Sequence, residues 1–304
     1  MSAIDTEGVA SGLPPVPPLN LKRHFSRRHV TDRFATTLIY GAFILALIPL
    51  VAVLAQTIIK GAKRFDPEFF THTLRNIGPR DAGGGALHAI IGSIEQVSIA
   101  TLIAVPLGLL AAIYLVEFQG GRITRVISLL VDVLTGLPSI VSGLFILSFF
   151  ILALGGNYAG IYGALALSIL MLPVVIRSTE EMLRLVPNSL REASAALGTP
   201  RWRTIVKIVL PTAATGIVTG IMLAIARVAG ETAPLILTVS YTTSLNLNPF
   251  SGPQASLPLM IYQEASKGLP TATNRAWSAA LVLIAFVMIL NIAARLLARR
   301  TTRR

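Results

Sequence analysis

The sequence predicts an all-α membrane protein with six transmembrane helices. Of its 304 residues, 53% are hydrophobic and only 13% are charged, about half the charged fraction of a typical soluble domain. Apolar stretches of about 20 residues, enough to cross a bilayer, alternate with shorter polar segments. Six stretches qualify or nearly do so: Phe34–Ile59, Ala89–Val116, Val126–Leu154, Ala159–Ile176, Thr212–Val239 and Trp277–Leu297. We therefore expect one membrane domain over residues 34–298.

Polar segments flank this domain. Residues 1–33 include Pro14, Pro15, Pro17 and Pro18, and this composition favours a flexible cytoplasmic tail. The first apolar stretch starts too far into the chain, and is too long, for a cleaved signal peptide. Residues 299–304 form a short basic tail, also expected in the cytoplasm.

The basic residues predict the orientation. With both termini in the cytoplasm, 18 of the 26 Lys and Arg residues lie inside, seven lie outside, and Arg227 lies within a span. Cytoplasmic loops of membrane proteins carry such an excess of positive charge. The net charge of +12 thus indicates topology and contacts with lipid headgroups, rather than nucleic-acid binding. Residues 60–88 and 240–276 become the long outer loops, where a binding protein would dock.

Several kinds of chemistry find no support in the sequence. The chain has no Cys, and its four His lie outside the six apolar stretches without ligand spacing, so we expect no metal site and solvated histidines. It also lacks the Gly-rich phosphate-binding loop that ends in Lys and Ser or Thr. The chain is therefore not expected to be an enzyme, and any ATP chemistry belongs to another subunit.

Helix-breaking residues recur within the spans, including Pro49, Pro106, Pro173, the Gly136-Leu137-Pro138 segment, and Gly230 with Pro234. A carbonyl freed by such a break needs a partner within the protein, because lipid offers none. Breaks at membrane depth therefore favour a packed transporter over an inert anchor.

The longest inner loop, residues 177–211, contains a spaced pattern. Glu192-Ala193-Ser194 is followed by Gly198 and, nine residues later, by Ile208-Val209-Leu210-Pro211. Ser189 and Glu192 have capping-box spacing, which predicts the start of a short helix. Gly198 would end that helix in the left-handed conformation. Thr199 and Pro200 would start a second helix.

Pro211 then marks the entry to the fifth span. A short helix tied in this way to a transmembrane helix can transmit motion from a soluble ATPase. Two alternatives remain from the residues alone: the helix rests on lipid headgroups, or Glu192 is merely a cap.

Ionisable residues within the spans are candidate functional groups, because burying a charge in a membrane is costly. Arg227 and Glu231 are four residues apart, so on one helix they would share a face and neutralise each other. The pair is either a structural salt bridge or an arginine that meets an anion in the path. Arg177 is either a second cation on the path or an interfacial residue. Glu95 and Asp132 lie inside spans, with partners left open.

Three stretches carry a family resemblance: Gly136–Val141, Leu172–Met182 and Arg227–Leu235. The pattern in the inner loop is similar to that of ABC importer permeases, with Ser194 in place of an Ala. The Arg-x-x-Gly-Glu-Thr-Ala-Pro stretch narrows the resemblance to the phosphate branch. Over residues 34–298 the chain resembles the PstA-type permeases of the phosphate-specific ABC importer.

This resemblance implies a type I importer fold and a heterodimer with a C-type sister permease. It also implies a dimer of ATPase subunits, which bind ATP and magnesium, and an extracytoplasmic phosphate-binding protein. Arg177 and Arg227 match the membrane arginines that the family links to transport. We therefore expect ATP-driven phosphate import across the plasma (inner) membrane, with no cofactor bound by this chain.

Two alternatives to this function are a permease for sulfate or molybdate, and a secondary transporter that works without ATP. The pattern in the inner loop argues against the second, because such a carrier needs no coupling helix.

Overall fold

The computed structural model describes residues 27–118 and 120–301, and all regular elements within them are helices. The chain divides into two units, one up to Val53 and one from Leu54 onward. Helix α1, Arg27–Gly61, crosses this boundary and contains Pro49. It is long and apolar enough to span a membrane. The predicted Pro-rich tail falls largely outside the described residues, as do residues 302–304.

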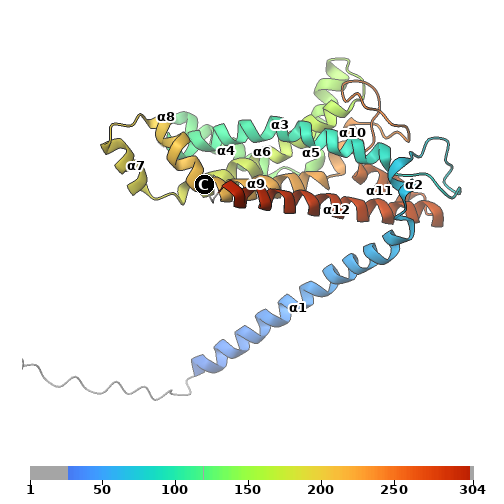
Figure 1. Cartoon of the computed structure of the whole chain (residues 1–304), viewed down its shortest axis with the longest axis horizontal. Coiled ribbons are helices and arrows are strands. Elements are labelled where there is room, and N and C mark those ends of the chain that lie inside the picture. Colours follow the sequence, from blue (N-terminus) through green and yellow to red (C-terminus); the bar gives the residue numbers. More distant parts are fainter. Residues whose placement is uncertain (1–26, 119, 302–304) are drawn as a thin grey trace, which may run out of the picture. The chain divides into compact units, whose positions relative to one another are not determined.

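The second unit is a bundle of long helices (Figure 1). Among the described residues, five helices, α1 included, are long and apolar enough to cross a membrane. The bent pair of α4 and α5 makes a sixth span if the two helices together are taken as one span. The long helices of the bundle are α3 (Leu87–Glu117), α6 (Gly160–Arg184), α9 (Leu210–Ala229) and α12 (Pro270–Thr301). The predicted all-α membrane fold is confirmed.

The third predicted span is not one straight helix. Helix α4 covers Arg122–Gly136, and α5, Ser139–Ile146, continues into a π-helical segment, Leu147–Ala153. The axis bends by 105° between the two parts. The cause is Pro138, because a proline disfavours helical backbone in the residue before it, and Leu137 is extended with ψ 132°.

Helix α6 is longer than predicted. The sequence analysis ended the fourth span at Ile176, but the helix continues through the polar residues to Arg184, with Pro173 inside it. Arg177 therefore lies within a helix and not at the start of a loop. Likewise α12 begins at Pro270, seven residues before the predicted start of its span.

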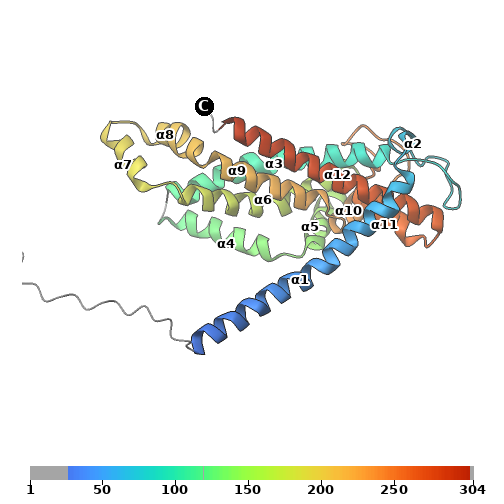
Figure 2. The ribbon, with the colours of Figure 1, turned by 60° about the horizontal axis from the view of Figure 1, so that its bottom comes forward.

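Short helices occupy the two ends of the bundle. Figures 1 and 2 show α7 (Asn188–Ala196) and α8 (Arg201–Thr204) at one end, and α2 (Pro67–Thr71) and α11 (Leu257–Ser266) at the opposite end. Another short helix, α10, covers Ala233–Thr238 at the end of the predicted fifth span. The loops predicted to lie on opposite membrane faces thus lie at opposite ends of the bundle.

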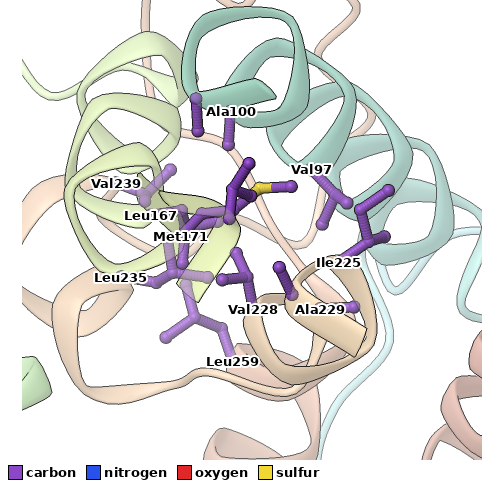
Figure 3. Close-up of a cluster of buried hydrophobic side chains, with 13 residues drawn as sticks. Val97, Ala100, Leu167, Met171, Ile225, Val228, Ala229, Leu235, Val239 and Leu259 are labelled. Atoms are coloured by element: carbon purple, nitrogen blue, oxygen red, sulfur yellow. The ribbon is translucent and has the colours of Figure 1, made fainter. Parts of the chain in front are cut away.

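The buried core forms around the middle of α6. Leu167 and Met171 of α6 lie in one apolar cluster with Val97 and Ala100 of α3 and Val228 of α9 (Figure 3). The cluster also includes Ile225, Ala229, Leu235, Val239 and Leu259. Small residues let the helices approach: a Cβ built on Gly108 of α3 would lie 2.6 Å from Val175 Cγ1 of α6. Such close contacts drive helix association within membranes.

Candidate functional site

The fifth predicted span, Thr212–Val239, is broken at mid-bundle depth. Helix α9 ends at Ala229, Gly230 caps it, and α10 starts only at Ala233. Pro234 contributes to this break because it lacks an N–H to continue the helical hydrogen bonds. At its other end the helix starts earlier than predicted, since α8, a π-helical segment and α9 form one helical run, Arg201–Ala229.

This break separates Arg227 from Glu231, and the prediction that they pair on one helical face is wrong. Arg227 lies in the last turn of α9, whereas Glu231 lies in the connection after it. In the part of the chain that the structure describes, neither side chain has a hydrogen-bond or ion-pair partner. The Arg227 residue is exposed and Glu231 is partly buried. A free guanidinium therefore lies at mid-bundle depth, beside the core residue Val228.

The small residues of α9 let α6 lie close to it. A Cβ on Gly216 would lie 2.2 Å from Met182 Sδ, and one on Gly220 would lie 2.5 Å from Ser178 Oγ. Arg227 lies two turns beyond Gly220, outside this close contact between α6 and α9. The tight packing of α6 and α9 thus fixes the backbone that carries the free arginine.

Arg177 of α6 is held by carboxylates, one of which is Asp132 of α4. Its Nη1 donates to Glu180 Oε2 at 2.7 Å, and its Nη2 donates to Ser128 Oγ at 3.2 Å. Glu180 is buried and also accepts from Arg184 Nη2 at 2.6 Å. The partner of Asp132, left open by the sequence, is therefore Arg177. This network joins α4 to α6 on the side of the bundle that leads to α7.

Glu95 of α3 has a partner at the other end of the bundle. It accepts a hydrogen bond from the side-chain amide of Gln254, which precedes α11. Gln96 donates to Gln254 Oε1 at 2.9 Å and to the carbonyl of Ala255 at 3.3 Å. These contacts join α3 to the segment before α11, and the Gln pair gave no signal in the sequence.

The pattern in the inner loop forms α7 and the turn after it. Gly198 has φ +71°, so the predicted left-handed conformation is confirmed. Ser194 is buried, and its hydroxyl lies 2.7 Å from Thr204 Oγ1 of α8. The replacement of Ala by Ser at position 194 therefore adds a hydrogen bond between the two short helices. Glu192 and Ala193 are exposed on α7.

The predicted caps of these helices are wrong. Helix α7 begins at Asn188 with Pro187 as its N-cap, and α8 begins at Arg201 with Pro200 as its N-cap; neither N-cap makes a side-chain hydrogen bond. The fixed φ of proline and the extended backbone that it favours start each helix without a capping box. Leu210 packs into the bundle, and Pro211 lies in the first turn of α9.

Sequence reasoning missed a buried polar cluster at the opposite end. Arg275 of α12 donates from Nε to Glu264 Oε2 of α11 at 2.7 Å, and both are almost fully buried. Arg275 Nη1 also donates to the carbonyl of Asp81 at 2.9 Å. Lys267 forms a second ion pair with Glu264. The Glu264–Arg275 pair thus ties the loop between α2 and α3 to α11 and α12.

His88 and Tyr241 lie near this cluster. His88 is buried in the first turn of α3, 3.4 Å from Tyr241 Oη, so the expectation that it is a solvated loop residue is wrong. Burial raises the pKa of the Tyr241 hydroxyl well above its usual value, and the Glu264 carboxylate acts in the same direction. The tyrosine is therefore neutral throughout the physiological pH range.

Comparison with known proteins identifies similar chains. The family model of the binding-protein-dependent transport system inner membrane component matches residues 104–303. Phosphate transport system permease protein PstA 1 of Mycobacterium tuberculosis (strain CDC 1551 / Oshkosh) is 48% identical over 291 residues, 95% of this chain and 96% of the relative. The PstA protein of Mycobacterium leprae (strain TN) is 46% identical over 281 residues, 91% of this chain and 92% of the relative.

A solved structure shows the same fold. A bacterial alginate ABC transporter, solved with a periplasmic protein that carries an alginate pentasaccharide, matches with a TM-score of 0.60. The match covers 91% of this chain and 97% of that chain at 14% sequence identity. At this identity the likeness concerns the helical architecture alone.

Proposed function

Because this chain belongs to the family of inner membrane components of binding-protein-dependent transport systems, we propose that its 177–211 loop couples the bundle to a separate ATPase. The chain is a multi-pass inner-membrane permease of a phosphate ABC importer. As the family name states, transport by such systems depends on a binding protein.

The continuity of Arg201–Ala229 is the observation that carries the coupling proposal. Helix α7 projects its exposed Glu192 and Ala193 from one end of the bundle. The Ser194–Thr204 contact joins α7 to α8, and α8 continues into α9. A displacement of α7 by an ATPase therefore moves α9, and with it Arg227. Gly198, Leu210 and Pro211 belong to the same mechanical link, because they shape the turn and the entry to α9.

Arg227 is proposed as a cation that meets phosphate in the path. An arginine at membrane depth needs a partner, and within the described residues this chain supplies none for Arg227. A phosphate oxyanion offers the charge and the acceptors that a guanidinium binds best. Glu231, in the connection between α9 and α10, is proposed to line the same path. Arg177 is proposed as a second cation, which Asp132 and Glu180 hold while the path is empty.

The remaining partners complete the proposed importer. A C-type sister permease forms the heterodimer, and a dimer of ATPase subunits binds ATP and magnesium. An extracytoplasmic phosphate-binding protein docks on the end of the bundle that carries α2 and α11. Membrane lipid surrounds the bundle, and both termini are cytoplasmic. The chain itself binds no cofactor and no nucleic acid.

Two single-cysteine variants test this orientation and the site of ATPase docking, because the chain has no Cys of its own. Leu197 at the end of α7 is 85% exposed, and Phe250 near the opposite end is 72% exposed. In intact cells an impermeant thiol reagent should label Phe250→Cys but not Leu197→Cys. In opened membranes Leu197→Cys should react, and the ATPase subunit should slow that reaction. Labelling of Leu197→Cys in intact cells would overturn the orientation, and an unchanged rate with the ATPase present would overturn the docking site.

A further inference from the structure

Glu117 is a buried carboxylate that contacts both short helices of the inner loop. It is the last residue of α3, and its side chain is 7% exposed. Its Oε1 lies 3.2 Å from Arg191 Nε of α7, and its Oε2 lies 3.8 Å from Arg201 Nε at the start of α8. One side chain of the bundle thus meets the helix that we propose as the ATPase contact and the helix that continues into α9.

Arg191 makes further contacts that fix its position. It donates from Nη1 to the carbonyl of Val186 at 2.7 Å, and from Nη2 to the carbonyl of Leu183 at 3.0 Å. Leu183 belongs to α6, so the guanidinium joins α7 to α3 and to the end of α6. Within the described part of the chain, Arg191 also donates to Asn188 Oδ1 at 3.3 Å.

Stability of α3 alone does not explain a glutamate at this position. The C-terminal end of a helix carries partial negative charge, so a carboxylate there is unfavourable. Burial adds a further cost unless the charge is paired. Arg191 and Arg201 offset both costs, so Glu117 gains its favourable surroundings only while α7 and α8 stay in place.

The surroundings leave space for α7 to move. A cavity of about 600 Å³ lies beside the pair, and its lining includes Glu117, Phe118, Arg191 and Arg201. The Arg201 guanidinium lies 4.6 Å from the centre of the Phe118 ring. When α7 tilts, breaking the Glu117–Arg191 pair would strand a buried charge. The lower-energy response is for the end of α3 to follow α7.

We propose that Glu117 is a positioning residue that transmits the displacement of α7 to α3, in parallel with the continuous helix that transmits it to α9. The inference rests on the proposed coupling function. Helices α3 and α9 both pack against α6 in the central core. Joint displacement of α3 and α9 would therefore shift two of the helices that pack against α6, which carries Arg177. Through the Glu117–Arg191 pair, the displacement of α7 thus moves α3 as well as α9.

The test uses Glu117→Gln in the complete importer, reconstituted in liposomes with its sister permease, ATPase and binding protein. Glutamine keeps the shape of the side chain but removes its charge. We expect normal co-purification of the ATPase and continued ATP hydrolysis, with phosphate imported per ATP reduced by about tenfold. This ratio reports only assembled complexes, so a loss of folding alone does not change it. Glu181→Gln, an exposed carboxylate of α6 at the same end of the bundle, is the matched control and should keep the wild-type ratio.

A second variant reverses the charges. Glu117→Arg combined with Arg191→Glu restores an ion pair and should recover part of the lost import per ATP. A wild-type ratio in Glu117→Gln would overturn the inference, as would loss of the ATPase from that variant, since Glu117 would then serve docking. Failure of the proposed function would show instead in the wild-type importer, as import that does not depend on ATP.

Discussion

Replacing Arg227 with Gln should abolish phosphate uptake while the permease still assembles with its partners. The arginine is exposed at the end of α9 and has no partner within the residues that the structure describes, so its loss leaves no buried carboxylate unpaired. Folding should therefore change little. Transport should stop, because the path loses the charge that offsets the lost hydration of phosphate. The measurement is uptake of radiolabelled phosphate by cells or proteoliposomes, normalised to assembled permease.

Matched variants separate a substrate contact from a general need for positive charge. Arg125→Gln makes the same change at an exposed position near the start of α4 and should leave uptake near normal. Arg227→Lys should retain part of the activity, because it keeps the charge but loses the two-pronged donor geometry. Since Glu231 does not pair with Arg227, Glu231→Gln should have a smaller effect than Arg227→Gln. Near-normal uptake by Arg227→Gln would end the role proposed for this arginine.

Replacing Glu264 with Gln should strongly destabilise the end of the bundle that carries α11. The carboxylate and Arg275 are almost completely buried and form a direct ion pair. Removing one member of such a pair leaves an uncompensated buried charge and costs about 3–5 kcal/mol of folding free energy. We expect a much lower yield of folded protein and a marked fall in its thermal unfolding temperature in detergent.

Lys267→Gln is the control for this prediction. It removes the more exposed cation of the cluster, whose side chain is 32% exposed, and leaves the Glu264–Arg275 pair intact. Its effect on the unfolding temperature should therefore be small. Equal stability of Glu264→Gln and the wild type would show that the buried pair does not hold the loop between α2 and α3 against α11 and α12.

The sequence was sufficient for the fold class and for the short helix of the inner loop. Long apolar stretches have one stable form in a membrane, the helix, because each backbone polar group must find its partner locally. Gly198 was predictable for a similar local reason, since a left-handed residue after a helix favours glycine. The likeness of the Arg227–Leu235 stretch to a known family narrowed the predicted substrate to phosphate.

Errors arose where two local signals competed. Hydropathy extended the third and fifth spans across Pro138 and Pro234, whereas backbone sterics break or bend the chain near both. The supposed Arg227–Glu231 pair failed for this reason, because helical spacing has no meaning across a break. The capping box failed because Pro187 and Pro200 begin the helices one or more residues away from the predicted caps.

Other contacts could not be predicted because they join residues far apart in the chain. Asp132 and Arg177 meet only when α4 lies against α6, and Glu117 meets Arg191 only when α7 folds back on the end of α3. The local sequence places Asp132 within an apolar span but identifies no partner for Asp132 or Glu117. Their partners follow from helix packing, which a single sequence does not specify.

The most direct test of an ATP-driven phosphate permease is uptake by proteoliposomes that contain the complete importer, with the membrane potential clamped at zero. Phosphate should accumulate only when ATP is present at the ATPase side, and excess sulfate or molybdate should not compete with it. Accumulation without ATP, driven by an imposed potential or proton gradient, would contradict the account.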